Sequence, residues 1–219
     1  MYCVNGPTCL RAGVYGCFAV AERAARWKPP VIDSRRELPA DCFNDRPSGA
    51  TIQAVVIHFT SAVTIKPNDP YNLETILDIF KGKAEPNPEK VSAHDRIDRQ
   101  GTIYRLVDDA KRAWHAGLSK MPDGEEDVNN FPIGIQMVRK ADEVPTDAQD
   151  EALASLVLDL ERRHKAIAKD SIVGHDTIRA HWNKSHPEHL GPVKDDPGPL
   201  FHWSRLLKRL DDQGFDTVK

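Results

Sequence analysis

An apolar run rich in β-branched residues extends from Ala54 to Phe59 and is interrupted only by His58. A run this short, without polar alternation, is typical of a strand that is buried on both faces of a sheet. Such a strand holds a side chain at its carboxyl end rigidly, which suits a ligand of a metal ion. The pattern therefore predicts a buried strand that presents His58 to a site.

Helix and strand patterns follow one another along the rest of the chain. Apolar residues recur at helical spacing over 72–82 and 201–210, and Thr146 with Gln149 has the pattern of a capping box that opens another helix. The other segments that we predict are a hairpin of 91–97 with 102–107, a loop over 111–119, a solvated acidic segment over 121–128, and strands over 132–138 and 171–174. This order predicts an α/β fold with a central mixed β-sheet flanked by helices.

Composition divides the chain into three parts. Residues 1–49 mix Gly, Pro, Cys and Arg, which predicts an N-terminal extension or arm with a short helix over 19–27. Residues 50–210 form the main domain, and residues 211–219 form a C-terminal tail. All four cysteines, Cys3, Cys9, Cys17 and Cys42, lie in the arm, and their spacing leaves open one or two disulfides or free thiols.

Charge and hydropathy exclude several classes of partner. A net charge of -3 and a pI near 6.3 give no reason to expect a nucleic-acid or anionic-membrane surface. No apolar run approaches the roughly 20 residues that a membrane span needs. The apolar stretch near Cys17 is short and broken by Gly13 and Gly16, so it is no convincing signal peptide. We expect a soluble monomer whose cellular location is open.

Two histidines and an acidic pair are the candidate metal ligands. His58 ends the apolar run, His175 follows a predicted strand, and Asp195 and Asp196 precede Pro197-Gly198-Pro199. Two imidazoles and one carboxylate are a common ligand set for a hydrolytic zinc, whose fourth position is left to water. These residues alone leave the choice between the two aspartates open.

Seven short motifs occur in one order along residues 50–210. They are Val55-Val56-Ile57-His58-Phe59-Thr60, Val91-Ser92-Ala93-His94, Arg99-Gln100-Gly101, Arg112-Ala113-Trp114-His115-Ala116-Gly117, Ile133-Gly134-Ile135, Gly174-His175 and Asp196-Pro197-Gly198-Pro199. This order resembles the zinc-dependent N-acetylmuramoyl-L-alanine amidases of the AmpD/AmiD type, relatives of amidase-type phage lysozymes and of peptidoglycan recognition proteins. The resemblance implies a mixed sheet with one zinc ion in a groove at the strand ends. It also implies cleavage of the amide between the lactyl group of N-acetylmuramic acid and L-alanine, in peptidoglycan or in muropeptides.

The resemblance also implies roles for particular residues. The zinc ligands would be His58, His175 and Asp196, with Asp196 favoured over Asp195 because it directly precedes Pro-Gly-Pro as in the family. Lys194 matches the family's catalytic lysine, the alternative being a solvated loop lysine. The residues expected to line the substrate groove are Arg112, Trp114, His115 and Asn129.

The chain departs from the family pattern at Gln136. Close AmpD/AmiD relatives carry a glutamate there, which is expected to accept a proton, and general-base help is typically worth ~10²–10⁴ in rate. Amidase-type phage lysozymes also lack this glutamate and remain active. Gln136 could therefore orient the water while Lys194 or a nearby histidine handles protons.

A second departure is the interval of 21 positions between His175 and Asp196, about twice that of AmpD-like chains. It contains His181, His186 and His189, which could line the groove, bind a second metal, act as a base, or lie in a polar surface loop. Of the remaining histidines, we interpret His94 as a hydrogen-bonded core or near-site residue, and His164 and His202 as surface or packing groups.

Two rival functions remain beside the amidase. One is a non-catalytic receptor that binds muropeptides in the same groove, and the other is a zinc hydrolase of a different amide. Receptors of this kind usually lose metal ligands, whereas this chain keeps all three, which favours the enzyme. We expect an enzyme that acts on the cell wall, from the periplasm, after secretion or by phage delivery.

Overall fold

The computed structural model describes residues 29–33, 36–84 and 89–215. The helix predicted over 19–27 and the cysteines at 3, 9 and 17 lie outside these ranges. Cys42 is buried and is a free thiol. Within the described residues, no helix is long and apolar enough to cross a membrane.

A six-stranded mixed sheet forms the centre of the molecule. Its strands are, in spatial order, β1 (Ile32–Asp33), β5 (Ile103–Arg105), β4 (Asp95–Ile97), β7 (Pro132–Val138), β3 (Ala54–Thr60) and β8 (Ile172–Gly174). β3 pairs in parallel with both β7 and β8, whereas β4 and β5 form an antiparallel hairpin. The sheet confirms the predicted α/β fold.

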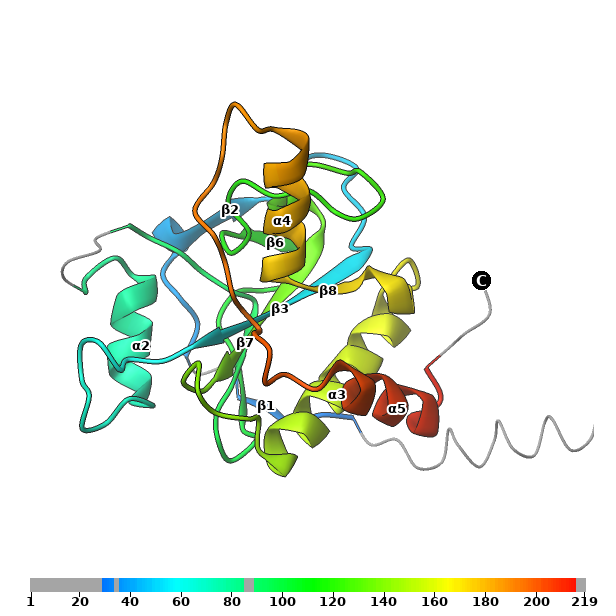
Figure 1. The fold of residues 1–219 in the computed structure, drawn as a ribbon. Helices are drawn as coiled ribbons and strands as arrows, with labels where there is room; N and C mark the ends of the chain where they lie inside the picture. The colour runs from blue at the N-terminus through cyan, green and yellow to red at the C-terminus, as the bar shows by residue number, and fades with distance from the viewer. Residues whose placement is uncertain (1–28, 34–35, 85–88, 216–219) are drawn as a thin grey trace, which may run out of the picture.

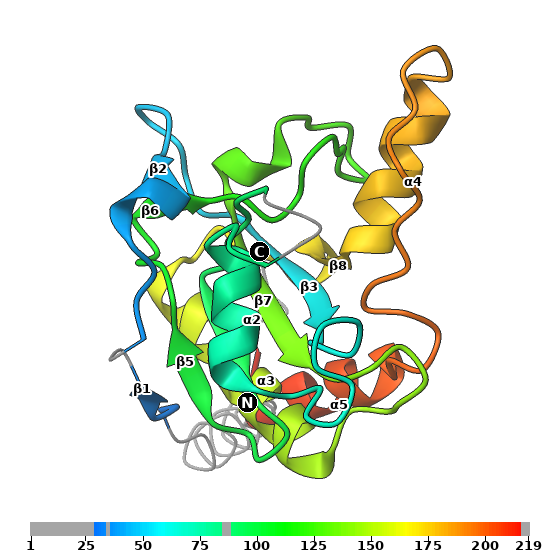
Figure 2. The same ribbon diagram turned by 90° about the vertical axis from the view of Figure 1, so that its left-hand side faces the viewer.

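Helices cover both faces of this sheet (Figures 1 and 2). α2 (Leu73–Phe80) packs on one face, and α3 (Asp147–Arg163) with α5 (Trp203–Gln213) packs on the other. Odd-numbered residues of β3 and β7, such as Ile57 and Ile135, belong to the core that α3 and α5 complete. Because side chains alternate along a strand, His58 and Gln136 lie on the opposite face.

Several elements lie where the sequence predicts them. β3 and β7 match their predicted strands, β4 and β5 form the predicted hairpin, and α2 begins after Asn72. The capping box of α3 is complete, since Thr146 Oγ1 accepts from the Gln149 backbone N–H at 3.1 Å and Gln149 Oε1 accepts from the Thr146 backbone N–H at 3.1 Å. Within the described ranges there are also three short 3-10 helices: η1 (Ala40–Cys42), η2 (Val128–Asn130) and η3 (Lys169–Ser171).

Three sequence predictions need correction. The predicted loop over 111–119 begins as strand β6 (Lys111–Ala113), which pairs antiparallel with β2 (Phe43–Asp45). The predicted solvated segment over 121–128 has buried apolar ends at Met121 and Val128. The interval after His175 begins with helix α4 (His175–Ser185) and is not a loop throughout. In each case tertiary contacts override the polar local sequence.

Candidate metal centre and substrate cleft

Three chain segments meet at the carboxyl ends of the parallel strands. His58 lies near the end of β3, and His175 is the first residue of α4, directly after β8. Ile57 of β3 pairs with Gly174 of β8 in the parallel register. His58 and His175 are the residues that directly follow this pair, so they lie next to each other. Asp196 reaches them from the segment that returns from α4 (Figure 1). Carboxyl ends of parallel strands are common places for ligand sites in α/β folds.

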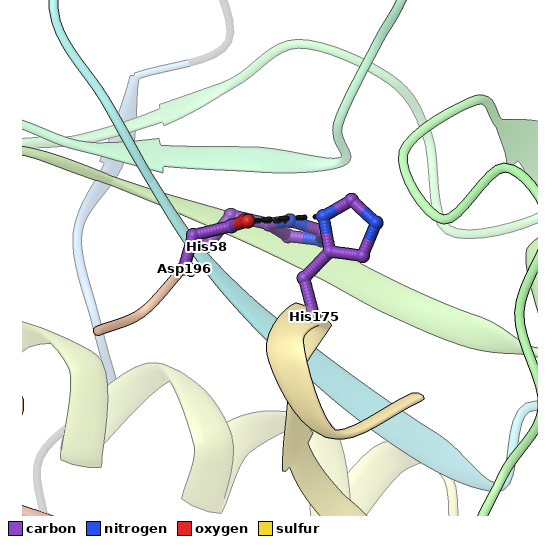
Figure 3. A group of neighbouring side chains, drawn as sticks. All are labelled: His58, His175 and Asp196. Atoms are coloured by element: carbon purple, nitrogen blue, oxygen red, sulfur yellow. Dashed lines mark hydrogen bonds and ion pairs between the residues drawn. The ribbon is translucent and has the colours of Figure 1, made fainter. Parts of the chain in front are cut away.

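The three side chains converge closely (Figure 3). Asp196 Oδ2 lies 2.7 Å from His58 Nδ1 and 3.2 Å from His175 Nδ1. The three residues offer ligand atoms that all lie within 4.8 Å of one another, and among the described residues they are the one such group of three. Asp195, the rival of Asp196 in the sequence, is exposed. The group has the composition of a mononuclear zinc site, two nitrogens and one oxygen, with room for a further ligand.

The second ring nitrogen of each histidine also has a partner. His175 Nε2 donates to the Ala116 carbonyl at 3.2 Å, which fixes the ring as the tautomer with a free Nδ1. His58 Nε2 lies 3.1 Å from His115 Nδ1, and donation from His58 to His115 likewise frees Nδ1 of His58. Hydrogen bonds of this kind orient metal-binding imidazoles. The donor set and its supporting contacts therefore fit a zinc ion.

Burial and charge set the protonation states around this group. Burial by itself would raise the pKa of Asp196, but the close contacts of its Oδ2 with the His175 and His58 rings hold that pKa well below its usual value. Burial lowers the pKa of His58, and burial together with the neighbouring imidazoles lowers the pKa of His115 well below its usual value. These shifts favour an ionised Asp196 and a neutral His58, which are the forms of these two residues that bind a metal.

A cleft of about 330 Å³ opens beside the three side chains. It is lined by His58, Phe59, Val91, Ser92, Trp114, His115, Gln136, His175, Val193, Lys194, Asp195 and Asp196. Val91 is 37% exposed and Val193 is 88% exposed, so the cleft combines polar groups with exposed apolar ones. The sequence candidates Lys194, Gln136, His115 and Trp114 all line this cleft.

Gln136 and Lys194 approach the group from different elements. Gln136 pairs with His58 in the parallel register of β7 and β3, so the two side chains point to the same side of the sheet. Its Oε1 is buried and has no hydrogen-bond partner among the described residues. Lys194 is half-buried. Burial is the main cause that lowers the pKa of His58, Asp196 opposes it, and the charges of His175 and Lys194 lower that pKa further.

Asn129 and Arg112 do not line the cleft. Asn129 Oδ1 accepts hydrogen bonds from the backbone N–H groups of His115, at 3.0 Å, and Ala116, at 2.8 Å. Arg112 lies on β6, where its Nη1 donates to Asn44 Oδ1 at 3.3 Å. The Trp114 indole donates to the same Asn44 oxygen at 2.9 Å while lining the cleft.

The other histidines lie outside the three-residue group. The rings of His186 and Trp182 stack with centroids 3.9 Å apart, and His189 is exposed. His94 is fully buried, and its Nδ1 accepts from the Gly134 N–H at 2.9 Å. His164 contacts Asp109 at 3.1 Å.

Arg139 supports the site and has no signal in the sequence. It is fully buried, its Nη2 donates to the Pro197 carbonyl, and its guanidinium lies 4.6 Å from the centroid of the Phe59 ring. It therefore fixes the turn that follows Asp196. The partner lies 58 positions away, and no local pattern predicts such a contact.

The mixed sheet, the two histidines with one aspartate at its strand ends and the adjoining cleft together form a candidate metal site of the kind that metallohydrolases use. Residues 48–199 match the family described as N-acetylmuramoyl-L-alanine amidase. The chain is 34% identical over 189 residues to the 1,6-anhydro-N-acetylmuramyl-L-alanine amidase AmpD of Haemophilus influenzae, which covers 82% of this chain and 94% of that protein.

Solved structures give the same result. A crystal structure of an AmpD selenomethionine derivative superposes with a TM-score of 0.66 and 31% identity, covering 84% of this chain and 98% of that one. The complex of Escherichia coli AmiD with anhydro-N-acetylmuramic acid-L-Ala-D-gamma-Glu-L-Lys has a TM-score of 0.54 and 25% identity, covering 75% of this chain and 60% of that one. The chain belongs to the N-acetylmuramoyl-L-alanine amidase family and is an amidase.

Proposed function

We propose that this amidase binds one zinc ion through His58, His175 and Asp196 and hydrolyses the lactyl–L-alanine amide of 1,6-anhydro muropeptides. The convergence of the three side chains in the cleft is the observation that carries the proposal. The choice of anhydro muropeptides is supported by the name of the Haemophilus influenzae relative and by the ligand in the AmiD complex. Zinc, when bound, polarises an amide carbonyl and makes water more acidic.

In this proposal, Lys194 stabilises negative charge and donates a proton. Its ammonium lines the cleft next to the ligand group, where negative charge develops on the carbonyl oxygen as the amide is attacked. Lys194 Nζ can also give a proton to the leaving amine, which an amide needs because the amine is a poor leaving group. No other lysine lines this cleft among the described residues.

Four other cleft residues are suited to bind and orient the substrate: Gln136, Val91, Val193 and Trp114. Gln136 can donate to and accept from an amide or a water, but a carboxamide does not accept a proton at neutral pH. Val91 and Val193 provide apolar surface for the methyl groups that flank the scissile bond on the lactyl and alanyl sides. The Trp114 indole offers a flat face for a sugar ring.

One observation favours the rival receptor function. Gln136 stands where close relatives have a glutamate, so the chain lacks the expected proton acceptor at this position. In a receptor the same cleft would hold a muropeptide without cleaving it. The retained set of three ligand side chains supports the enzyme.

The test is incubation of zinc-loaded protein with a 1,6-anhydro muropeptide and, separately, with intact sacculi, followed by chromatography and mass spectrometry. We expect free stem peptide from the muropeptide, loss of release in a chelator, and recovery with added zinc. Asp196→Asn should abolish release, while Asp195→Asn serves as the matched control and should retain most of it. Tight binding without release would establish the receptor, and faster release from sacculi would overturn the substrate assignment.

A further inference from the structure

The long interval between His175 and Asp196 is an ordered structure. α4 occupies its first half, and the return segment, residues 186–195, runs back beside the helix toward the central sheet (Figures 1 and 2). Its last three residues, Val193, Lys194 and Asp195, line the cleft. The path of the return segment therefore decides where the Lys194 side chain enters the site.

Asn183 ties the return segment to α4. Its Nδ2 donates to the Gly191 carbonyl at 3.1 Å, and its Oδ1 accepts from the Gly191 N–H at 2.8 Å. The carboxamide thus satisfies both polar groups of one residue, as a backbone partner would in a strand. A second tie joins the Trp182 indole to the His189 carbonyl at 3.0 Å.

Close packing at Gly191 reinforces this tie. A Cβ atom added there would lie 1.8 Å from Nη1 of Arg179, a residue of α4 that is only 4% exposed. The return segment therefore packs against the Arg179 side chain so closely that a larger residue at position 191 would displace the buried guanidinium.

The other end of the segment has its own supports. The Asp176 N–H, in the first turn of α4, donates to the Asp196 carbonyl at 2.8 Å. Arg139 holds the carbonyl of the next residue, Pro197. Residues 192–195 thus span two fixed points, Gly191 and Asp196, and the second of these does not depend on Asn183.

We infer that Asn183 is a positioning residue for Lys194, acting through Gly191. Loss of the Asn183 carboxamide frees the Gly191 end of the span and displaces Lys194, while Asp196 stays in place on its own supports. The inference rests on the proposed function, because that proposal assigns Lys194 its role in the reaction. The inference goes beyond the proposed function because it assigns a role to the long interval between His175 and Asp196, which is to position Lys194 in the cleft.

A double-mutant cycle on the zinc-loaded enzyme tests this inference. The variants are Asn183→Ala, Lys194→Ala and the double variant, with Lys184→Ala as the control because Lys184 is an exposed residue of the same helix. We expect Asn183→Ala to lower kcat by up to about 10²-fold, as for a displaced catalytic group. The double variant should be no slower than Lys194→Ala, zinc affinity measured by chelator competition should be unchanged, and Lys184→Ala should behave as the parent.

Two further measurements test the contact between Asn183 and Gly191, and the second of them does not depend on catalysis. Asn183→Asp keeps an acceptor for the Gly191 N–H and should retain more activity than Asn183→Ala. Hydrogen exchange at the Gly191 amide should accelerate in Asn183→Ala.

The outcomes separate the two proposals. Unchanged activity in Lys194→Ala would overturn the role of Lys194 in the proposed function, whatever the exchange data show. If Lys194→Ala lowers activity, two results would overturn the inference and leave the proposed function in place. One is that the losses multiply in the double variant, and the other is that Asn183→Ala loses no activity.

Discussion

Gln136 occupies the position at which close relatives have a glutamate, so it bears on how a proton would leave the attacking water in the proposed reaction. Its side chain lies beside His58 across the paired strands, with a buried oxygen that lacks a partner. Gln136→Glu would place a proton acceptor there with almost no change in shape. We expect kcat to rise at least tenfold, toward the ~10²–10⁴ typical of general-base help. Steady-state kinetics of stem-peptide release at neutral pH measure this.

The matched control for that change is Gln136→Met, which keeps the length of the side chain and removes its polar atoms. It should raise KM if the carboxamide binds substrate. An unchanged kcat in Gln136→Glu would show that the proton goes to another group, such as Lys194.

Asn129 contacts the backbone next to the candidate metal ligands. Its Oδ1 accepts from the Ala116 N–H, and the carbonyl of the same residue accepts from His175 Nε2. Asn129→Ala should lower zinc affinity about 10–100-fold, the usual effect of removing a support behind a metal ligand. Chelator competition measures this affinity directly. Asn130→Ala is the control, since Asn130 contributes its backbone carbonyl to Arg46; equal losses in both variants would contradict this role.

Some residues of the site can be predicted from the sequence and others cannot. His58 and His175 each stand next to a strand pattern, so the sequence alone proposes that they meet. The choice of Asp196 over Asp195 needs the family resemblance. Asn129 was expected in the groove, but its partners are backbone amides, which no motif specifies. No sequence pattern predicts the supporting role of Arg139, because its contacts form only in the complete fold.

At the scale of elements, α3 illustrates a reliable signal. Its N-terminal capping box is local, so residues three positions apart determine it. Thr146→Ala removes the cap and the bond from Thr146 Oγ1 to the Arg99 carbonyl. We expect the free energy of unfolding to fall by about 1 kcal/mol, the usual cost of a lost N-cap. Urea denaturation measures this, and kcat should not change because α3 lies behind the sheet; a fall in kcat would contradict that separation.

The elements that were missed depend on distant partners. β6 is a three-residue polar strand that exists because β2, about 70 positions earlier, pairs with it. α4 has no apolar periodicity strong enough to predict it, and its polar side chains instead tie down the return segment. Short polar elements of this kind obtain their stability from tertiary contacts and leave little trace in local sequence.

At the scale of the whole molecule, the site depends on the complete sheet. The three candidate ligands come from β3, from α4 and from the residue that directly follows the return segment, and they meet only when β8 pairs with β3. His94 belongs to the same framework, because it is buried and its Nε2 donates to the Lys111 carbonyl at 3.1 Å. Its ring thereby links the central sheet to β6.

His94 makes the stability of the whole fold depend on pH. Burial, with the nearby charge of Arg46, lowers the pKa of His94 from 6.5 to about 3. Below pH 6.5 the unfolded chain therefore binds a proton that the folded protein does not, and the free energy of unfolding falls with pH by up to about 1.4 kcal/mol per pH unit. His94→Asn keeps an acceptor for the Gly134 N–H and removes the titrating group. Urea denaturation at pH 7 and pH 5.5, with chelator present so that metal release does not contribute, should show a loss smaller by about 1 kcal/mol in the variant. Equal losses in the two proteins would mean that His94 is protonated in the folded state.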